Sequence, residues 1–277
     1  MSSFPPFVEL KGSDVKTIHT TKQHPLGTRG ITQDGRVFRY ALNGAAALGM
    51  GIPVASAAIE VLEKDTEYTA PINDTEDIST TWREFTVETE SCTGEITADD
   101  YADGYIRVAN STASNAKGQL VRIKSNDASA TSSTDALGST MTITFADDDK
   151  LTASLDTGAV TALHHSPYWK VVVMSGGGTA ERVVGVPVRP VTAAYYFWAQ
   201  TWGPCAVVQD GTVLSGVNVR PSTSTSEAVA MSTPTASTEI TATDASFLAL
   251  RRPPIGWAMG SPGTDAYFGL MFLTIAP

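Results

Sequence analysis

Carboxylates are the first groups in this chain that could do chemistry, and two clusters of them stand out. Residues 147–149, three consecutive aspartates, could bind calcium, but they lack the alternating spacing and the distal glutamate of a helix-loop-helix calcium site. We interpret them as a solvated turn between two strands. Asp99, Asp100 and Asp103 could supply the acid and the base of a glycoside hydrolase. Their small and polar neighbours indicate a solvated acidic loop instead.

The histidines, glycines and cysteines do not form a recognisable site either. His164 and His165 are adjacent, and neighbouring residues of a strand point to opposite faces, so one metal ion cannot easily use both. The glycine run at residues 175–178 lacks the lysine and hydroxyl of a phosphate-binding loop, and no nucleophile-elbow motif occurs. Cys92 and Cys205 lie far apart and are expected as two buried thiols. We therefore predict no catalytic residue, no metal site, no cofactor and no enzymatic activity.

The composition favours an all-β fold. Only 17% of the 277 residues are charged, and the abundant Thr, Ser, Ala, Gly and Val are strand or turn formers. The net charge of −10 argues against nucleic-acid binding, which needs a basic face. Glycines and a proline interrupt the longest apolar run, residues 41–58, so we expect no membrane span. The first residues show no features of a secretory signal.

The distribution of charge and of turn-forming Gly and Pro residues divides the sequence into three predicted modules. Residues 1–60 form an extended arm and a β-hairpin, residues 61–162 an acidic β-rich module, and residues 163–277 a module like a β-barrel or sandwich. The net charge is +3 over residues 1–59 and −11 over residues 60–110. This polarity suits head-to-tail docking of copies, or docking on an acidic partner. The proline-rich start of the arm lacks a core of its own and is expected to lie on another subunit.

A hairpin turn is predicted at Asp34-Gly35, where a two-residue loop joins residues 31–32 to residues 37–40. Arg36 and Arg39 flank this turn. Either they pair with the acidic segment or a neighbouring subunit, or they stay solvated on an edge strand.

Alternating apolar and polar residues predict further strands in both later modules. In the acidic module they fall at residues 85–89, 105–109, 119–124, 140–145 and 151–155. In the last module, two prolines make residues 183–190 an edge strand. Residues 267–275 are nearly all apolar and predict a central, buried strand.

Residues 194–216 concentrate the aromatic side chains of the last module. We expect the aromatic stretch to break at Gly203-Pro204 and to resume as a short apolar strand. A hairpin turn at Asp210-Gly211 then joins this strand to a second one, at residues 212–214. Burial inside the module explains this concentration of aromatic side chains better than a surface on which a ligand stacks. The residues predicted to lie in the core are Tyr196, Trp198, Trp202 and Trp257.

Two stretches resemble virion structural proteins of tailed bacteriophages, in particular their capsid cement or decoration proteins. The first stretch, residues 23–40, contains His24-Pro25-Leu26-Gly27 and then Asp34-Gly35-Arg36 before Phe38 and Tyr40. The second, residues 183–275, contains the aromatic stretch, the Asp210-Gly211-Thr212 turn, Gly256-Trp257-Ala258 and the apolar ending. The likeness covers roughly half the chain, rests on turn and aromatic positions, and does not extend to the acidic module.

The resemblance implies a head decoration protein that binds the outer capsid surface after synthesis in the host cytoplasm. Its partners would be the major capsid protein and other copies of itself, as homotrimers, with no nucleic acid and no membrane. Deletion of residues 1–28 is then expected to release the protein from capsids. The residues predicted to contact the shell or a neighbour are Phe4, Phe7, Pro25, Leu26, Arg29, Arg36 and Arg39.

Two other functions remain open at this point. One is a tail, baseplate or head-fibre component that binds the host surface or a glycan through exposed aromatics. The other is a surface hydrolase that degrades host polysaccharide with Asp99 or Asp103.

Overall fold

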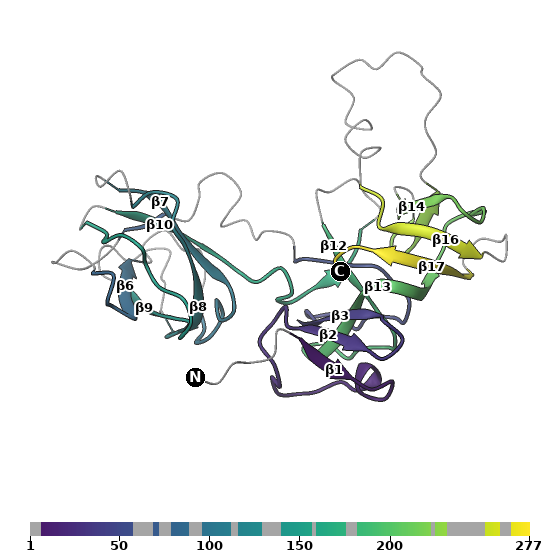
Figure 1. Ribbon diagram of the computed structural model, residues 1–277, viewed down its shortest axis with the longest axis horizontal. Coiled ribbons are helices and arrows are strands. Elements are labelled where there is room, and N and C mark those ends of the chain that lie inside the picture. Colours follow the sequence, from purple (N-terminus) through teal and green to yellow (C-terminus); the bar gives the residue numbers. More distant parts are fainter. Residues whose placement is uncertain are drawn as a thin grey trace, which may run out of the picture. The chain divides into compact units, whose positions relative to one another are not determined.

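The chain forms two compact units, each built from β-strands (Figure 1). One unit is Met1–Ala58 together with Pro167–Pro277, and the other is Ile59–Ser166. The computed structural model describes residues 7–57, 69–71, 79–88, 96–111, 116–128, 140–156, 159–175, 182–222, 225–231, 253–260 and 267–277. The all-β prediction is confirmed for these residues, which contain no α-helix. The predicted acidic module lies within the second unit, whereas the predicted arm and last module share the first, except for residues 59–60 and 163–166.

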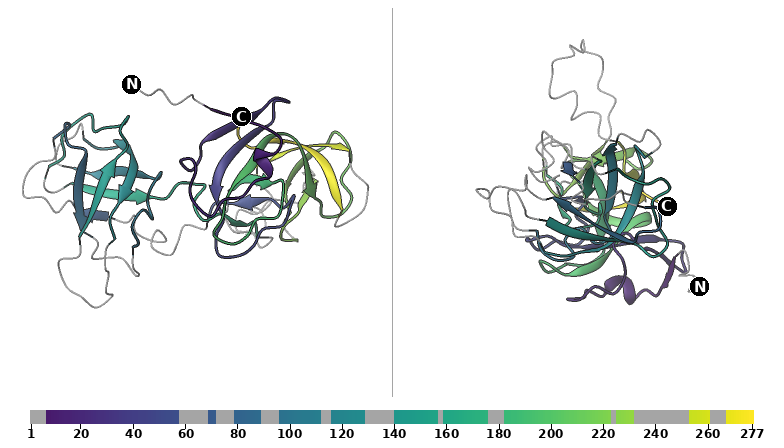
Figure 2. Two further views of the ribbon diagram at one scale, coloured as in Figure 1. Left: turned by 90° about the horizontal axis from the view of Figure 1, so that it is seen from below. Right: turned by 90° about the vertical axis from the view of Figure 1, so that its left-hand side faces the viewer.

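The first unit contains one 11-stranded sheet. Its main path runs β1-β2-β3-β13-β17-β16-β14-β15, and β12, β4 and β11 branch from β13. The strands are β1 (Val8–Leu10), β2 (Arg29–Thr32), β3 (Val37–Leu42), β4 (Val54–Ala55), β11 (Val172–Val173), β12 (Val183–Pro187), β13 (Tyr196–Val208), β14 (Asn218–Pro221), β15 (Val229–Met231), β16 (Gly256–Gly260) and β17 (Phe268–Thr274). Segments from both ends of the chain therefore join in one sheet, which Figure 2 shows from two further sides.

The long strand β13 connects two halves of this sheet. Its first half pairs with β3 and its second half, from Trp202 onward, pairs with β17. A register shift between Gln200 and Trp202 and the positive φ of Gly203 (+90°) accompany the change of partner. The predicted break at Gly203-Pro204 is therefore wrong, because the strand continues through it. The predicted hairpin at Asp210-Gly211 is also wrong, since residues 212–214 form no strand.

Strand β17 is central, as predicted, but only one of its faces is buried. Met271 and Leu273 point into a core formed with valines of β12, β13 and β14. Phe268 and Leu270 point outward and are exposed. The expectation of a fully buried strand is wrong, because the described residues cover this sheet on one side only at these positions.

The four aromatic residues predicted to lie in the core are likewise not all buried. Trp198 is buried, and Tyr196 and Trp202 are half-buried. Trp257 is 37% exposed, so its predicted core position is wrong.

The hairpin of β2 and β3 is confirmed, with a loop one residue longer than predicted. Gly35 N–H donates to Thr32 O at 2.9 Å, and Thr32 N–H donates to Arg36 O at 3.0 Å. Gly35 has a φ of +81°. These features describe a three-residue loop with glycine in the left-handed conformation. An Asp-Gly pair suits this loop as well as it suits a two-residue loop, because both need a residue with positive φ.

The N-terminal segment lies on the chain's own sheet. Strand β1 pairs in parallel with β2, and a short 3-10 helix, η1 (Asp14–Lys16), follows. Leu10 and Val15 are buried in a cluster with Phe38, Tyr40 and Trp198. His19 then exchanges two main-chain hydrogen bonds with Tyr196, at 2.8 and 2.9 Å. The expectation that this segment needs another subunit to lie on does not hold for residues 8–19.

The second unit contains one six-stranded sheet in the order β5-β10-β7-β8-β9-β6. Its strands are β5 (Thr69–Pro71), β6 (Glu84–Glu88), β7 (Tyr105–Asn110), β8 (Leu120–Asn126), β9 (Thr140–Phe145) and β10 (Val160–His164). Strands β6, β7, β8 and β9 confirm four of the five strands predicted for this module. The fifth, residues 151–155, forms no named strand; Leu151 and Leu155 instead fill the core of this unit. Among the described residues no ladder closes the sheet into a barrel.

Candidate interaction surfaces

The predicted contact residues of the arm have different environments. Phe4 lies outside the described residues, and Phe7 is 41% exposed. Pro25 and Leu26 form the turn before β2, where Thr28 donates its main-chain N–H (3.1 Å) and its hydroxyl (2.7 Å) to Pro25 O. Leu26 also packs against the cluster beneath the arm. Pro25 and Leu26 are therefore engaged in intramolecular packing, whereas Phe7 is accessible to a partner.

Arg29 and Arg39 are brought together by the sheet. They are directly opposite each other on β2 and β3, so their side chains project from the same face. Arg39 donates to the carbonyl of Gly27 at 3.1 Å and to the main-chain oxygen of Pro277 at 3.3 Å. The Nε atoms of both arginines are buried without a hydrogen-bond partner, and Arg29 forms no ion pair within the described part of the chain. Like charges facing each other across strands are unfavourable, so this pair is a cationic site that an external anion would stabilise.

Arg36 does not join this pair. Its Nε lies 2.7 Å from Asp34 Oδ2, and its guanidinium carbon lies 5.6 Å from the centre of the Phe38 ring. The hydroxyl of Thr32 and then the Arg36 side chain lower the pKa of Asp34. Arg36 thus neutralises its own hairpin loop.

A cavity of about 290 Å³ lies between the N-terminal segment and the sheet. His24 faces it, edge-on to Tyr40 (ring centres 5.3 Å apart) and tilted against Trp198 (5.4 Å). Burial, and then the nearby His19, lower the pKa of His24. The cavity is lined by Val8, Glu9, Leu10, Asp14, Thr17, His19, Gln23, His24 and Trp198. Sequence reasoning missed it, because two histidines in an apparent arm carry no signal until the arm is folded onto Trp198.

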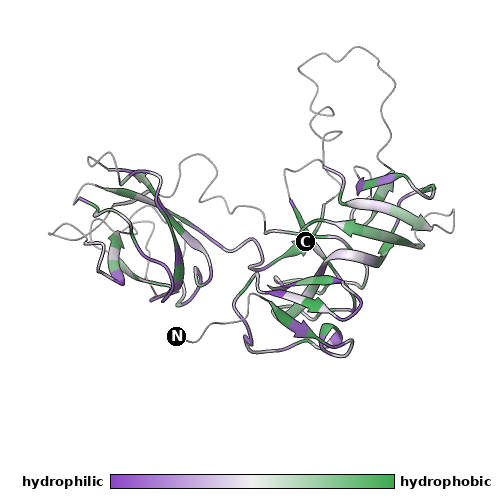
Figure 3. Ribbon diagram, viewed as in Figure 1, coloured by the Kyte–Doolittle hydropathy of each residue, from purple (hydrophilic) through white to green (hydrophobic). Residues whose placement is uncertain are grey.

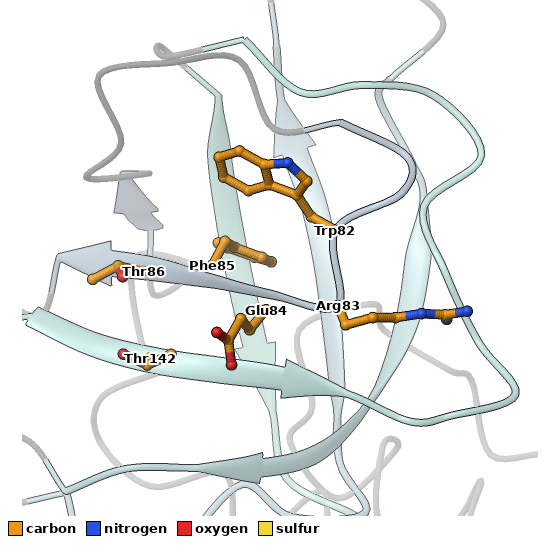
Figure 4. Close-up of a pocket in the computed structure, with 6 residues that line it drawn as sticks. All are labelled: Trp82, Arg83, Glu84, Phe85, Thr86 and Thr142. Atoms are coloured by element: carbon orange, nitrogen blue, oxygen red, sulfur yellow. The ribbon is translucent and has the colours of Figure 1, made fainter.

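A second, larger hollow of about 430 Å³ lies over β6 and β9 in the second unit (Figure 4). Its lining residues are Trp82, Arg83, Glu84, Phe85, Thr86 and Thr142. Arg83 donates to the carbonyl of Asp149 at 2.8 Å, and Figure 4 shows its side chain pointing away from Trp82 and Glu84. Glu84 is the one carboxylate in this lining, so the hollow has no acid–base pair among the described residues.

The acidic loop of the second unit has a structural role. Asn126 accepts a hydrogen bond from Tyr101 N–H at 2.8 Å and donates to Thr97 O at 3.1 Å. Asp99 and Asp103 both have positive φ angles, and Asp103 is buried. The prediction of a solvated loop is therefore wrong for Asp103, which is buried and donates its main-chain N–H to Ile123 O at 3.0 Å.

The remaining polar groups are also engaged locally. Asp147 pairs with Lys124 at 2.9 Å, which lowers the pKa of Asp147, and Asp149 accepts the Arg122 N–H at 2.8 Å. His165 stacks on Tyr101 with ring centres 4.2 Å apart. Within the described ranges, no group of three or more His, Cys, Asp or Glu side chains could hold a metal ion.

The prediction of two buried thiols can be compared with the structure for one of the two cysteines. Cys205 is buried, as predicted, and burial raises its pKa to about 12. Cys92 lies outside the described residues.

The most extended apolar surface is the outer face of β13, β17 and β16, which we call the outer apolar face. Every outward-pointing side chain of these strands is uncharged. It consists of Trp202, Pro204, Ala206 and Val208 of β13, Phe268, Leu270, Phe272 and Thr274 of β17, and Trp257 and Met259 of β16. Sequence reasoning missed this surface, because apolar residues on both faces of β17 indicated burial on both.

Comparison with known protein families, with characterised proteins and with solved structures gives no match to this chain. None of the helical residues that the structure describes belongs to a helix long and apolar enough to span a membrane. The family and the function of the chain are therefore argued from its own residues.

Proposed function

We propose that this chain is a structural virion protein of a tailed bacteriophage, bound to the outer capsid surface. It decorates and stabilises the shell by bridging neighbouring major capsid subunits, and it assembles with other copies of itself as homotrimers. The observation that carries the proposal is the folding of the two phage-like stretches into one sheet. Residues 23–40 supply β2 and most of β3, residues 183–275 supply β12 to β17, and β3 pairs directly with β13. The stretches that share the resemblance thus form a single structural unit, although the whole acidic unit separates them in the sequence.

The Arg29–Arg39 pair supports docking on an acidic partner. Two like charges opposite each other on a sheet are unfavourable by about 0.2–1 kcal/mol. A carboxylate of a capsid subunit placed beside Arg29 would reverse that sign and supply a charge-assisted hydrogen bond. Because a shell presents the same contact many times, modest interfaces are sufficient when copies are linked to one another.

The proposal is tested with virions that lack the protein, to which purified protein is added back. We expect saturable binding, and cryo-electron microscopy is expected to show density at symmetry-related positions on the head. Arg29→Ser should weaken binding at least 5-fold and reduce its salt dependence, while the folded protein becomes slightly more stable because the repulsion with Arg39 is gone. Arg182→Ser, which removes an exposed charge from the same unit, is the matched control and should bind normally.

Deletion of residues 1–28 is a less clean test, because it removes Leu10 and Val15 from the cluster that covers Phe38 and Trp198. If the protein is found on the tail or baseplate, the competing function of host-surface or glycan binding is favoured. If it is absent from purified virions, the proposal fails.

A further inference from the structure

We propose that the outer apolar face of β13, β17 and β16 is the surface through which copies of this chain bind to one another. Figure 3 shows β17 as a largely hydrophobic ribbon at this position. Four large side chains of the face are between 37 and 47% exposed: Trp257, Met259, Phe268 and Leu270. Soluble proteins rarely leave so many large apolar side chains contiguous and in contact with water.

The face is held in shape by its backbone register and by aromatic contacts. Pro204, Phe272 and Trp257 lie side by side across the three strands, and Ala206 lies opposite Leu270. Trp257 stacks on Phe272 with ring centres 5.4 Å apart and planes 10° apart, and Trp202 meets the edge of Phe272 at 5.6 Å. A face fixed in this way loses little side-chain entropy when a partner covers it.

The exposed area suits the centre of a protein–protein interface. With about 200 Å² for a fully exposed large apolar side chain, the four residues leave about 300 Å² in water. The half-buried Trp202 and Phe272 and the exposed Pro204 extend the patch toward about 500 Å². An interface of standard size covers about 800 Å² on each partner and has an apolar centre of this extent within a polar rim. Thr274 and Asn218 supply polar groups at the edge of the patch.

The uncharged character of the face and its exposed area together point to a second copy as the occupant. Two copies with a net charge of −10 each repel one another, so a contact between copies is opposed least where it brings no further like charges together. The outer apolar face meets this requirement at every outward position of its three strands. Such a surface is complementary to an uncharged surface of an identical molecule without any matching of opposite charges. The Arg29–Arg39 pair, by contrast, is suited to an acidic partner of a different kind.

This inference shares with the proposed function the claim that copies associate, but it requires no capsid. It is therefore tested on the purified full chain by sedimentation equilibrium between about 1 and 100 µM protein. The wild type should form oligomers, and the measured mass gives the number of copies. Leu270→Asp should weaken association at least 100-fold, because it replaces a buried methyl contact by a carboxylate that has no partner.

Leu120→Asp is the matched control, because Leu120 is an exposed strand leucine of the second unit (56% exposed) and the charge change is the same. It should associate as the wild type does. Met259→Lys provides a second, milder substitution on the face, and circular dichroism with thermal melting checks that each variant is folded.

The inference is overturned if the wild type is monomeric at 100 µM, or if folded Leu270→Asp and Met259→Lys proteins associate as tightly as Leu120→Asp. A monomeric wild type whose binding to virions is lost in Leu270→Asp would assign the face to the shell; the capsid-binding part of the proposed function would survive, but its homotrimers would not. Oligomers that depend on Leu270 but never bind virions would support the inference and refute the proposed function.

Discussion

Gly30 of β2 lies directly beneath the side chains that attach the N-terminal segment to the sheet. A β-carbon at this position would lie 2.9 Å from Leu10 Cγ and 2.9 Å from Trp198 Cζ3, and closer still to Leu10 Cδ1. Because Leu10 and Trp198 are both buried, neither can move away without disturbing the cluster. Overpacking of this kind costs about 1–3 kcal/mol, while alanine in a strand regains about 0.5–1 kcal/mol over glycine. We therefore expect Gly30→Ala to lower the free energy of unfolding of the first unit by about 1–2 kcal/mol.

Gly12 provides a control of opposite sign in the same segment. A β-carbon there would meet no atom within 4 Å, and the φ angle of Gly12 is not positive. Gly12→Ala should be neutral or stabilising by up to about 1 kcal/mol, because it reduces only the entropy of the unfolded chain.

Leu10→Ala completes the test as a double-mutant cycle. Alone it should cost about 2–4 kcal/mol through the cavity that it leaves. Combined with Gly30→Ala, it removes the atoms that clash with the new methyl group. The double variant should therefore be more stable than the sum of the single changes predicts, by about 1 kcal/mol.

Guanidinium unfolding followed by tryptophan fluorescence reports mainly on the first unit. Four of the five tryptophans, Trp169, Trp198, Trp202 and Trp257, belong to it. The reasoning is refuted if Gly30→Ala is as stable as Gly12→Ala, or if the cycle is additive. Either result would mean that residues 8–16 do not pack on β2 in solution.

Two further predictions follow from the titratable groups of the first unit. Because the pKa of His24 is lowered in the folded chain, the unfolded chain takes up a proton first, so stability is complete above about pH 6.5 and falls below it. Thermal unfolding at pH 7.5 and 5.5 should show a smaller loss for His24→Gln than for the wild type; an equal loss would contradict this account. Burial raises the pKa of Cys205 to about 12, so in a Cys92→Ser background a thiol reagent at pH 8 should label Cys205 only as fast as the protein unfolds. Labelling of the native protein within minutes would show that the thiol is accessible.

Several elements could be predicted from the sequence because their causes are local. The Asp34-Gly35 turn positions a glycine where the loop needs a positive φ, and the alternation in residues 105–109 and 140–145 places one side of each strand in a core. The absence of a recognisable catalytic motif is also a property of the sequence. Cys205 was expected to be buried from its apolar neighbours, and it is.

Other features depend on which segments pair across long distances. The second Asp-Gly pair, Asp210-Gly211, has the same local signal as the first but no hairpin, because β17 rather than residues 212–214 pairs with the end of β13. Local propensity cannot choose between two possible partners for the same strand edge.

The tertiary structure alone decided where the two proposed binding surfaces lie. Arg29 and Arg39 are ten residues apart in the sequence, and only the register of β2 and β3 sets them opposite each other. Phe268 and Leu270 have the same apolar character as Met271 and Leu273, so composition predicts burial for all four. Their strand alternates between a face covered by β12 and its neighbours and a face that the described residues leave open, and that difference arises from packing between distant segments.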